Sequence, residues 1–550
     1  MKYLVSLVCV GLSSGASAQT LIHSFDSQTF NDQLGYSVAN VGDIDGDGVN
    51  DLLAVARLAP TPGPGQGTAY VRSGATGELL FSFDSDSASL TFGISTNGVG
   101  DINQDGTPDI LLGDSRHENP GGLEGRVVVY SGVDASVLFE VQADDESEGL
   151  GTRVVGLGDV NGDGLPDFAG LAPRATIGGF VGEGVLIVYS GADASELYSV
   201  VGIQDGLSTP ASLANVGDLT GDGINEFAIG SSLNDDNGIY AGAVRIYDGS
   251  NGQSHFTFRG QAGDYFGTSV GEAGDVNGDG TPDIIVGASS FPQGPGYVQV
   301  FSGANGLPIH TLPSPVGFAA TMYGMSVTGV GDIGGDGFDD FAVSFLGFGV
   351  VGYAMHDGAT GNLIDLHHPS SLDNSVALGG NLVPMGDVNG DGVPDLAGSA
   401  ASFAPNSSIR VAVVSTAPLE LDADSPFVSI GDGGTQTLSI DFGPSHAGEF
   451  YWVFGSISGL SPQTPLLTQV IPLTFDNYFT FTIQNANTGF LVDTFGTLDG
   501  DGQASAAFSL PPGLDPSLVG RLGHHAAVSV ALAPLRFTNV TNAYPLKLVD

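Results

Sequence analysis

The sequence predicts an all-β protein in which seven copies of one repeat are followed by a smaller β-sandwich-like domain. The first observation is the stretch Gly274–Ala288, GDVNGDGTPDIIVGA, whose pattern occurs seven times at intervals of 55 to 59 residues. The second is the near absence of a helical period, since short apolar runs alternate with Gly- and Pro-rich turns. The third is the length of 550 residues, which is too great for one ordinary core. A steady period of this length is typical of repeat architectures.

One repeat unit can be followed from Phe266 to Leu312. A first strand leads into an acidic loop, a second strand follows at Asp283–Ala288, and a third follows at Gly296–Phe301. After a Ser-Gly-Ala-Asn-Gly turn, a fourth strand ends near Leu312. Four antiparallel strands form one blade of a β-propeller, so residues 19–416 are expected to form a seven-bladed β-propeller.

The third strand and its turn recur six times, although the acidic loop recurs seven times. The segment Leu21–Phe25 resembles the fourth-strand segment Glu78–Phe83. We therefore expect the N-terminal segment to supply the outer strand of the seventh blade. Such an exchange closes the ring and removes unpaired strand edges.

The acidic loop has the pattern D-x-[D/N]-x-D-G-x-x-D, in which every side-chain donor is a hard oxygen. Positions 1, 3 and 5 offer side chains, position 7 offers its carbonyl, and a carboxylate at position 9 completes the set. The Gly at position 6 permits the positive φ that the turn needs. Oxygen donors without His or Cys favour calcium, because crowded carboxylates repel one another without a cation. The alternative is an ordinary turn rich in Asp and Gly.

The predicted cofactor is Ca²⁺, up to seven ions, with weaker binding in the fourth and sixth loops. In the fourth loop Thr220 and Glu226 replace the usual residues at positions 3 and 9, and in the sixth Gly334 removes the side chain at position 3. The predicted metal ligands are Asp43, Asp45, Asp47, Val49 and Asp51; Asp101, Asn103, Asp105, Thr107 and Asp109; Asp159, Asn161, Asp163, Leu165 and Asp167; Asp218, Thr220, Asp222, Ile224 and Glu226; Asp275, Asn277, Asp279, Thr281 and Asp283; Asp332, Asp336, Phe338 and Asp340; and Asp387, Asn389, Asp391, Val393 and Asp395.

The repeat resembles the FG-GAP repeat of the integrin α-subunit head. An EF-hand would need a Glu at position 12 and flanking helices, which are missing here. The resemblance covers roughly Leu21 to Thr416 and includes Phe-Gly-like openings such as Phe266-Gly267 and a Gly-Ala-like close at Gly287-Ala288. It implies a calcium-binding propeller that takes its ligand on the face opposite the calcium loops. The loops expected on that recognition face are Pro60–Gln66, Arg116–Gly122, Leu233–Tyr240 and Phe291–Gly296.

Residues 1–18 read as a signal peptide, with Lys2, an apolar run and Ala16-Ser17-Ala18 before a cleavage site. The single cysteine, Cys9, lies within it, so the mature chain is expected to lack disulfides and thiolate metal sites. We expect a secreted, extracellular or cell-surface protein, with a periplasmic location as an alternative. The formal net charge of −48 makes nucleic acid a poor partner, and no later segment predicts membrane insertion.

Residues 417–550 form the predicted C-terminal domain, in which the acidic loop no longer occurs. Strand-like runs separated by Pro and Gly turns, among them Thr437–Phe442 and Tyr478–Ile483, favour a β-sandwich. Trp452, the only tryptophan, is expected to anchor the core of this domain.

The sequence predicts a binding protein rather than an enzyme. It contains no HExxH, no G-x-S-x-G and no P-loop, so no catalytic or organic-cofactor residues are assigned. By resemblance, the expected function is adhesion to, or recognition of, an extracellular protein or glycan. Two alternatives stay open, namely a carbohydrate-active propeller enzyme and a structural surface or matrix protein without a discrete ligand. Neither the partner nor the oligomeric state follows from the sequence.

Overall fold

The structure is a computed structural model of the chain. It describes residues 21–26, 32–60, 66–86, 89–118, 124–144, 148–177, 180–181, 184–201, 212–290, 294–315, 322–347, 350–367, 378–400, 410–416, 421–423, 427–429, 434–441, 449–456, 464–466, 469–471, 491–500, 503–510, 522–532, 535–540 and 544–549. Within these ranges all regular elements are strands, and no helix could cross a membrane. The predicted signal peptide and the predicted run Tyr478–Ile483 lie outside them.

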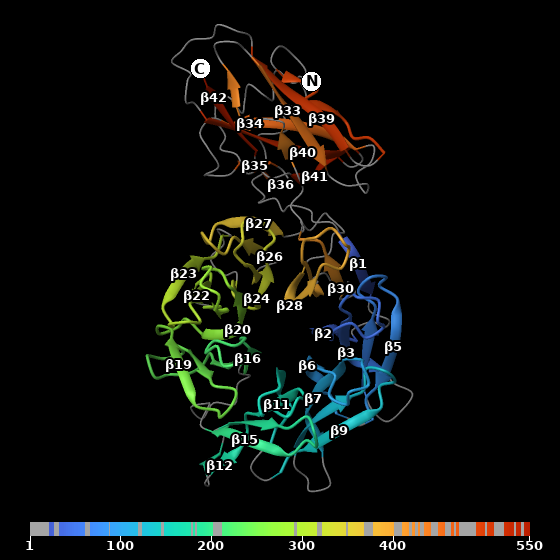
Figure 1. The fold of residues 1–550 in the computed structure, drawn as a ribbon, viewed down its shortest axis with the longest axis vertical. Helices are drawn as coiled ribbons and strands as arrows, with labels where there is room; N and C mark the ends of the chain where they lie inside the picture. Colours follow the sequence, from blue (N-terminus) through green and yellow to red (C-terminus); the bar gives the residue numbers. More distant parts are fainter. Residues whose placement is uncertain are drawn as a thin grey trace. The chain divides into compact units, whose positions relative to one another are not determined.

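Seven four-stranded antiparallel sheets form the blades of a β-propeller, as the repeat predicts (Figure 1). A short hairpin, β12 (Thr176–Ile177) with β13 (Phe180–Val181), extends the third blade. In order from first to fourth strand, the blades are β2 (Leu34–Asn40), β3 (Leu52–Pro60), β4 (Gln66–Arg72), β5 (Leu79–Asp84); β6 (Phe92–Gly100), β7 (Asp109–Glu118), β8 (Glu124–Tyr130), β9 (Val137–Gln142); β10 (Arg153–Gly158), β11 (Asp167–Ala172), β14 (Val185–Tyr189), β15 (Glu196–Val201); β16 (Ser212–Asn215), β17 (Phe227–Ser231), β18 (Ala243–Tyr247), β19 (Ser254–Arg259); β20 (Phe266–Gly274), β21 (Asp283–Ala288), β22 (Tyr297–Phe301), β23 (Pro308–Pro313); β24 (Val327–Gly331), β25 (Asp340–Gly347), β26 (Val350–His356), β27 (Leu363–His367); and β28 (Leu378–Gly386), β29 (Asp395–Ala400), β30 (Arg410–Val414), β1 (Leu21–Asp26).

The seventh blade joins the two ends of the propeller segment. Strand β1 pairs antiparallel with β30, with Phe25 opposite Val411 and Asp26 opposite Arg410. The predicted closure by the N-terminal segment is therefore confirmed. Closure leaves the first and last blades as neighbours, and their side chains share one buried cluster that includes Leu52, Ala397 and Val413.

The cores of the propeller lie between neighbouring blades. Side chains of the second and third strands are almost wholly buried, as in β21 and β14, whereas the fourth strands β5, β9 and β23 alternate between exposed and half-buried positions. One cluster joins Ala228 and Val244 of the fourth blade to Ile284 and Val286 of the fifth. Because each blade buries its faces against its neighbours, the ring as a whole provides the core that a single blade lacks.

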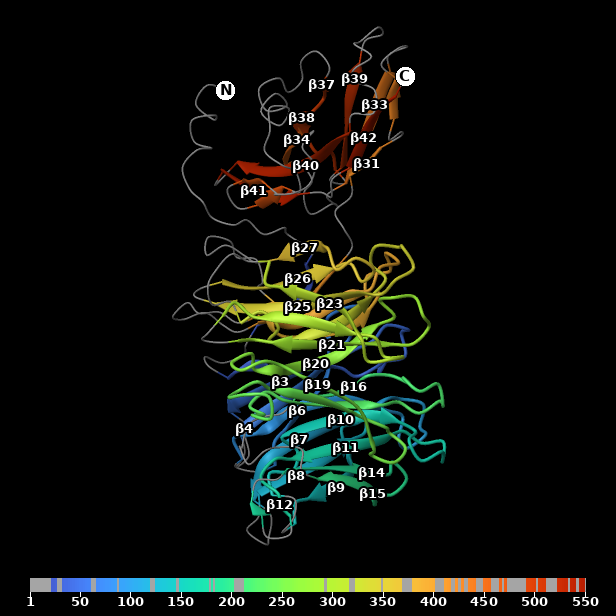
Figure 2. The ribbon, with the colours of Figure 1, turned by 90° about the vertical axis from the view of Figure 1, so that its left-hand side faces the viewer.

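The first strands surround a central channel. A cavity of about 1060 Å³ is lined by residues from β2, β6, β10, β16, β20, β24 and β28. Figure 2 shows the ring from its side, with the strands running between its two faces. Each first strand therefore begins near one mouth of the channel and ends near the other, where the acidic loops follow.

The second compact unit contains Ala417–Asp550 and its described strands form two main sheets. Buried Leu438 and Ile440 of one sheet share a cluster with Tyr451 and Val453 of the other. Trp452 packs edge-to-face on Phe495, with ring centroids 5.4 Å apart. The strands are β31 (Leu421–Ala423), β33 (Gly434–Asp441), β39 (Gln503–Leu510) and β37 (Leu491–Val492) in one sheet; β32 (Phe427–Ser429), β42 (Tyr544–Val549), β40 (Leu522–Leu532), β34 (Phe450–Ser456), β38 (Phe495–Thr497) and β41 (Leu535–Val540) in the other; and a separate pair, β35 (Thr464–Leu466) with β36 (Gln469–Ile471).

Candidate metal centres

All seven acidic loops lie in the described part of the chain, and each joins the first and second strands of its blade. Because the blades have the same strand order, the seven loops lie on the same face of the ring. The residue at position 9 begins the second strand, as Asp109 begins β7 and Asp283 begins β21, or directly precedes it. The predicted donors at positions 3 and 5 are exposed or half-buried, whereas the acid at position 9 is buried in every blade.

The loops fold around their own first carboxylate. In all seven copies the N–H of the Gly at position 6 donates to Oδ2 of the Asp at position 1 over 2.8 Å, as Gly280 does to Asp275. These glycines have φ between 85° and 93°, a region that is costly for other residues, so the predicted role of position 6 is confirmed. The carboxylate at position 5 accepts the N–H of position 7, as Asp279 does from Thr281 over 3.0 Å.

The acid at position 9 fastens the loop to the outer part of the blade. One of its oxygens accepts the N–H of position 2, as Asp283 does from Val276 over 3.0 Å. In five blades its other oxygen accepts the N–H of the Gly in the turn between the third and fourth strands, over 2.8 to 3.0 Å. In the fifth blade this Gly is Gly303, and a Cβ at that position would lie 1.9 Å from the carbonyl oxygen of Pro282.

Sequence reasoning identified the recurring Ser-Gly turn but missed this function of its glycine. The signal was available, because the turn and the acidic loop recur with the same period. The five glycines that donate to position 9 are Gly74, Gly132, Gly191, Gly303 and Gly358.

Two blades depart from this arrangement, and in both a buried carboxylate oxygen lacks a hydrogen-bond partner among the described residues. In the fourth blade this atom is Oε1 of Glu226, whose longer side chain bonds to the N–H of Leu219 but not to the turn. In the seventh blade it is Oδ1 of Asp395, since β1 comes from the N-terminal end and no turn glycine is present. A buried unpaired carboxylate oxygen is costly and indicates a missing partner, such as a cation.

Burial raises the pKa of several position-9 acids. The pKa of Asp51, Asp283, Asp340 and Asp395 rises to about 6, and that of Glu226 rises to about 7. Desolvation is the largest cause, and nearby carboxylates add to it in most of these loops, while the backbone hydrogen bonds act in the opposite direction. A cation in the loop would oppose both the desolvation and the repulsion.

The donor set fits a hard divalent cation. In the first loop, single carboxylate oxygens of Asp43, Asp45 and Asp51 all lie within 4.8 Å of one another. The other loops have Asn, Thr or Gly at position 3, and in the sixth the backbone N–H of Gly334 donates to Asp340 over 3.2 Å. Oxygen donors in a preformed turn are what calcium sites use.

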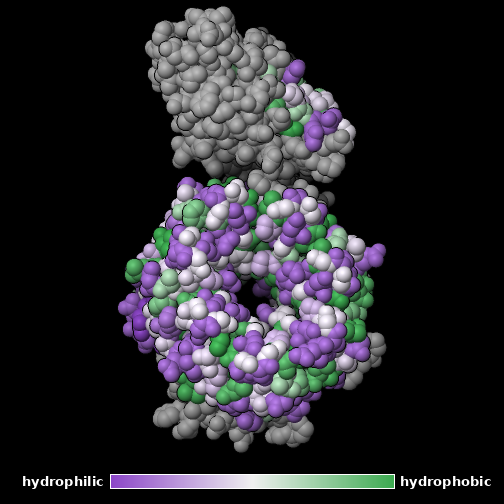
Figure 3. Space-filling view, viewed as in Figure 1, coloured by the Kyte–Doolittle hydropathy of each residue, from purple (hydrophilic) through white to green (hydrophobic). Residues whose placement is uncertain are grey.

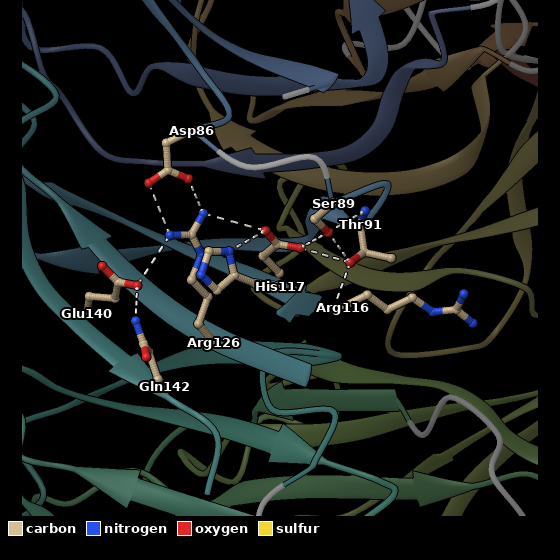
Figure 4. Close-up of polar contacts among 9 residues, drawn as sticks. Asp86, Ser89, Thr91, Arg116, His117, Arg126, Glu140 and Gln142 are labelled. Atoms are coloured by element: carbon tan, nitrogen blue, oxygen red, sulfur yellow. Dashed lines mark hydrogen bonds and ion pairs between the residues drawn. The ribbon is translucent and has the colours of Figure 1, made fainter. Parts of the chain in front are cut away.

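The opposite end of the second blade contains a buried ion-pair network (Figure 4). Arg126 is only 2% exposed and its guanidinium lies 2.5 Å from Asp86, 3.5 Å from Asp114 and 3.3 Å from Glu140. Asp114 also accepts a hydrogen bond from Ser89. Sequence reasoning did not find this network, because its members come from four separate segments.

Four loops are expected on the recognition face, opposite the acidic loops. Of these, Leu233–Tyr240 is fully described, and parts of the other three lie outside the described residues. Ile239 is 70% exposed beside Tyr240, whose ring stacks on Tyr265 with centroids 5.3 Å apart. An exposed apolar side chain next to a fixed aromatic pair is typical of binding surfaces.

Comparison with known proteins identifies the repeat. Residues 266–301 match the FG-GAP repeat family. Integrin alpha-5 of Xenopus laevis is 31% identical over 214 residues, covering 36% of this chain and 20% of that protein. Integrin alpha-PS3 of Drosophila melanogaster is 35% identical over 176 residues, covering 28% and 15%. A solved structure described as the Dos1 propeller has 11% identity and a TM-score of 0.41, and covers 74% of this chain and 97% of that one.

The chain therefore spans no more than about a fifth of the length of these integrins. It carries an FG-GAP repeat within a seven-bladed propeller similar to that of integrin α subunits, and the resemblance inferred from the motifs is confirmed.

Proposed function

We propose that this integrin-α-like propeller is a calcium-stabilised recognition module that binds an extracellular protein or glycan on the face opposite the acidic loops. Exported through residues 1–18, it would act outside the cell or at its surface. The residues of the seven loops named above would hold the ions, and calcium would supply positive charge to crowded carboxylates. The backbone N–H groups of each loop already hold these carboxylates in place before an ion binds.

The observation that carries the proposal is the repeated geometry of the loops. Seven separate segments place the same carboxylate on the same backbone N–H at the same 2.8 Å distance. Buried position-9 acids with raised pKa values favour a loop that binds a cation over an ordinary turn. The similarity to integrins and the apolar and aromatic residues Ile239, Tyr240 and Tyr265 support recognition rather than turnover.

The test is calcium titration of the mature chain, with the ion count and the melting temperature measured together. Ligands that bind only the native state raise its melting temperature, so a large rise with five to seven ions is expected. Asp275→Asn should lower the count by one. Asp193→Asn, in an exposed turn outside the acidic loops where Asp193 accepts the N–H of Ser195, should leave it unchanged. If no ion binds and the melting temperature does not shift, the loops are only turns.

The partner is tested separately, with calcium present. Saturable capture of one protein or glycan that is lost in Tyr240→Ala would support the recognition function. Turnover of a glycan would favour the enzyme alternative, and calcium-driven self-assembly would favour the structural one.

A further inference from the structure

The central channel of the propeller is polar along its walls. Its lining includes the hydroxyls of Ser37 and Thr96, which hydrogen-bond to each other over 2.7 Å across the first two blades. Figure 3 shows the central opening on one face, bordered largely by hydrophilic and weakly hydrophobic residues. A wall of hydroxyl, amide and glycine backbone groups suits a polar segment rather than a lipid chain.

The charged residues that line this channel are separated along its axis. Arg153 is the first residue of β10, so it lies near the mouth at which the first strands begin. Glu272 lies near the end of β20, and Asp339 belongs to the sixth acidic loop, so both lie near the opposite mouth. Burial, followed by the charge of Asp339, raises the pKa of Glu272. The channel thus has a positive mouth and an acidic one.

Arg153 has no carboxylate partner among the described residues. Its Nη1 donates to the carbonyl oxygen of Thr152 over 2.8 Å, and burial lowers its pKa. The side chain that interacts with it electrostatically is Tyr36, which is not a carboxylate. By contrast, the buried Arg126 has three carboxylates. Among the described residues that line the channel, Arg153 is the only arginine.

A second arginine, Arg57, lies against Tyr36. The guanidinium of Arg57 lies 3.9 Å above the centre of the Tyr36 ring and donates to Gln33 over 3.1 Å. Like Arg153, Arg57 has no ion pair in the part of the chain that the structure describes. Tyr36 is 39% exposed and therefore accessible from the channel. The mouth thus combines the guanidinium of Arg153, which has no ion pair among the described residues, with a phenol that Arg57 holds in place.

We propose that this mouth binds a carboxylate of a protein partner, with Arg153 as its ion-pair donor and Tyr36 as a hydrogen-bond donor beside it. Arg–carboxylate pairs are strong when water is excluded, and Arg153 is already half-buried. One isolated guanidinium pair suits a single Asp, Glu or chain terminus. A polyuronate glycan would bring many negative charges to an acidic surface and be repelled. This inference rests on the proposed recognition function and specifies the chemistry of its ligand.

The test uses the full mature chain in calcium at low ionic strength, with N-acetyl-glutamate amide as the probe and N-acetyl-glutamine amide as its uncharged match. Binding is measured by saturation-transfer NMR titration. The variant is Arg153→Gln, and the control is Arg174→Gln, because Arg174 is half-exposed, does not line the channel and lies in none of the loops expected on the recognition face. Melting temperature and bound calcium are recorded for each variant, so that a folding defect is recognised.

The expected result is saturable binding of the glutamate probe to the wild type and to Arg174→Gln, and at least tenfold weaker binding to Arg153→Gln. The glutamine probe should not bind to any of them. Equal binding to Arg153→Gln, or no binding of the glutamate probe to the calcium-loaded protein, overturns the inference and leaves the proposed function intact. If trigalacturonate binds through Arg153 more tightly than the glutamate probe, the ligand is an acidic glycan and the inference of a protein partner is wrong. Loss of calcium binding itself would instead refute the proposed function.

Discussion

The hydroxyl of Tyr323 lies 2.6 Å from Nε2 of His356 in the core between the fifth and sixth blades. Nδ1 of the same ring lies 3.1 Å from the carbonyl oxygen of Gly361. Since a carbonyl only accepts, Nδ1 carries the proton, Nε2 accepts from Tyr323, and the ring is neutral. Tyr323 is 0% and His356 is 4% exposed, so a second proton on His356 would be buried with no ion-pair partner among the described residues.

Stability is expected to fall with pH because of His356. Burial lowers its pKa from the ordinary 6.5 to about 4, so the unfolded chain binds this proton more readily than the folded one. The contribution of neutral His356 is complete above pH 6.5 and is lost as the pH falls towards 4, amounting to about 3 kcal/mol. Urea unfolding of the wild type and of His356→Gln between pH 4 and 7 measures this contribution as the difference between their unfolding free energies. If the unfolding free energies of the two proteins change with pH in the same way, His356 is not the cause.

Gly303→Ala should destabilise the fifth blade by more than about 2 kcal/mol. The added Cβ would lie 1.9 Å from the Pro282 carbonyl oxygen, so the turn would have to move away and lose its hydrogen bond to Asp283. Gly294→Ala is the matched control, since its nearest neighbour is Cβ of Ser290 at 3.5 Å. Thermal unfolding measures both, and an equal effect would contradict the fastening role of the turn.

In chelator, Asp283→Asn should cost about 1–3 kcal/mol more stability than Asp395→Asn. Both oxygens of Asp283 accept backbone N–H groups, from Val276 and from Gly303, so an amide at this position must lose one of these two hydrogen bonds. Oδ1 of Asp395 has no hydrogen-bond donor among the described residues, so the amide can replace this oxygen without losing a bond. Burial raises the pKa of both acids to about 6. The gain in stability from removing a buried charge is therefore similar in the two variants, and it cancels when their stabilities are compared. Denaturant unfolding of both variants gives the difference.

Arg126→Met should destabilise the protein by about 3–5 kcal/mol, because it leaves Asp114 buried without its partner. Arg174→Met removes a half-exposed pair with Glu124 and should cost less than about 1 kcal/mol. Equal losses in chemical unfolding would mean that the network does not depend on the burial of Arg126.

The features predicted from the sequence are those that a repeat encodes locally. The loop, its Gly280-type positive φ and the strand pairing within a blade follow from adjacent residues, and the closing strand Leu21–Asp26 follows from counting turns against loops. The pairing of Arg126 with Asp86, 40 residues away, depends on how one blade packs on the next. The mouth formed by Arg153 and Tyr36 depends on the ring as a whole, and no spacing in the sequence predicts it.

The pairing of β1 with β30 also affects how the chain is made. Asp26 leaves the ribosome long before its partner Arg410, and at about 5–20 residues per second the wait is roughly 20 to 80 s. During that time an early strand has no fourth-strand position to occupy, and the growing row of blades has open edges that could pair with other chains. Translation rate and chaperone supply should therefore determine the yield of closed rings.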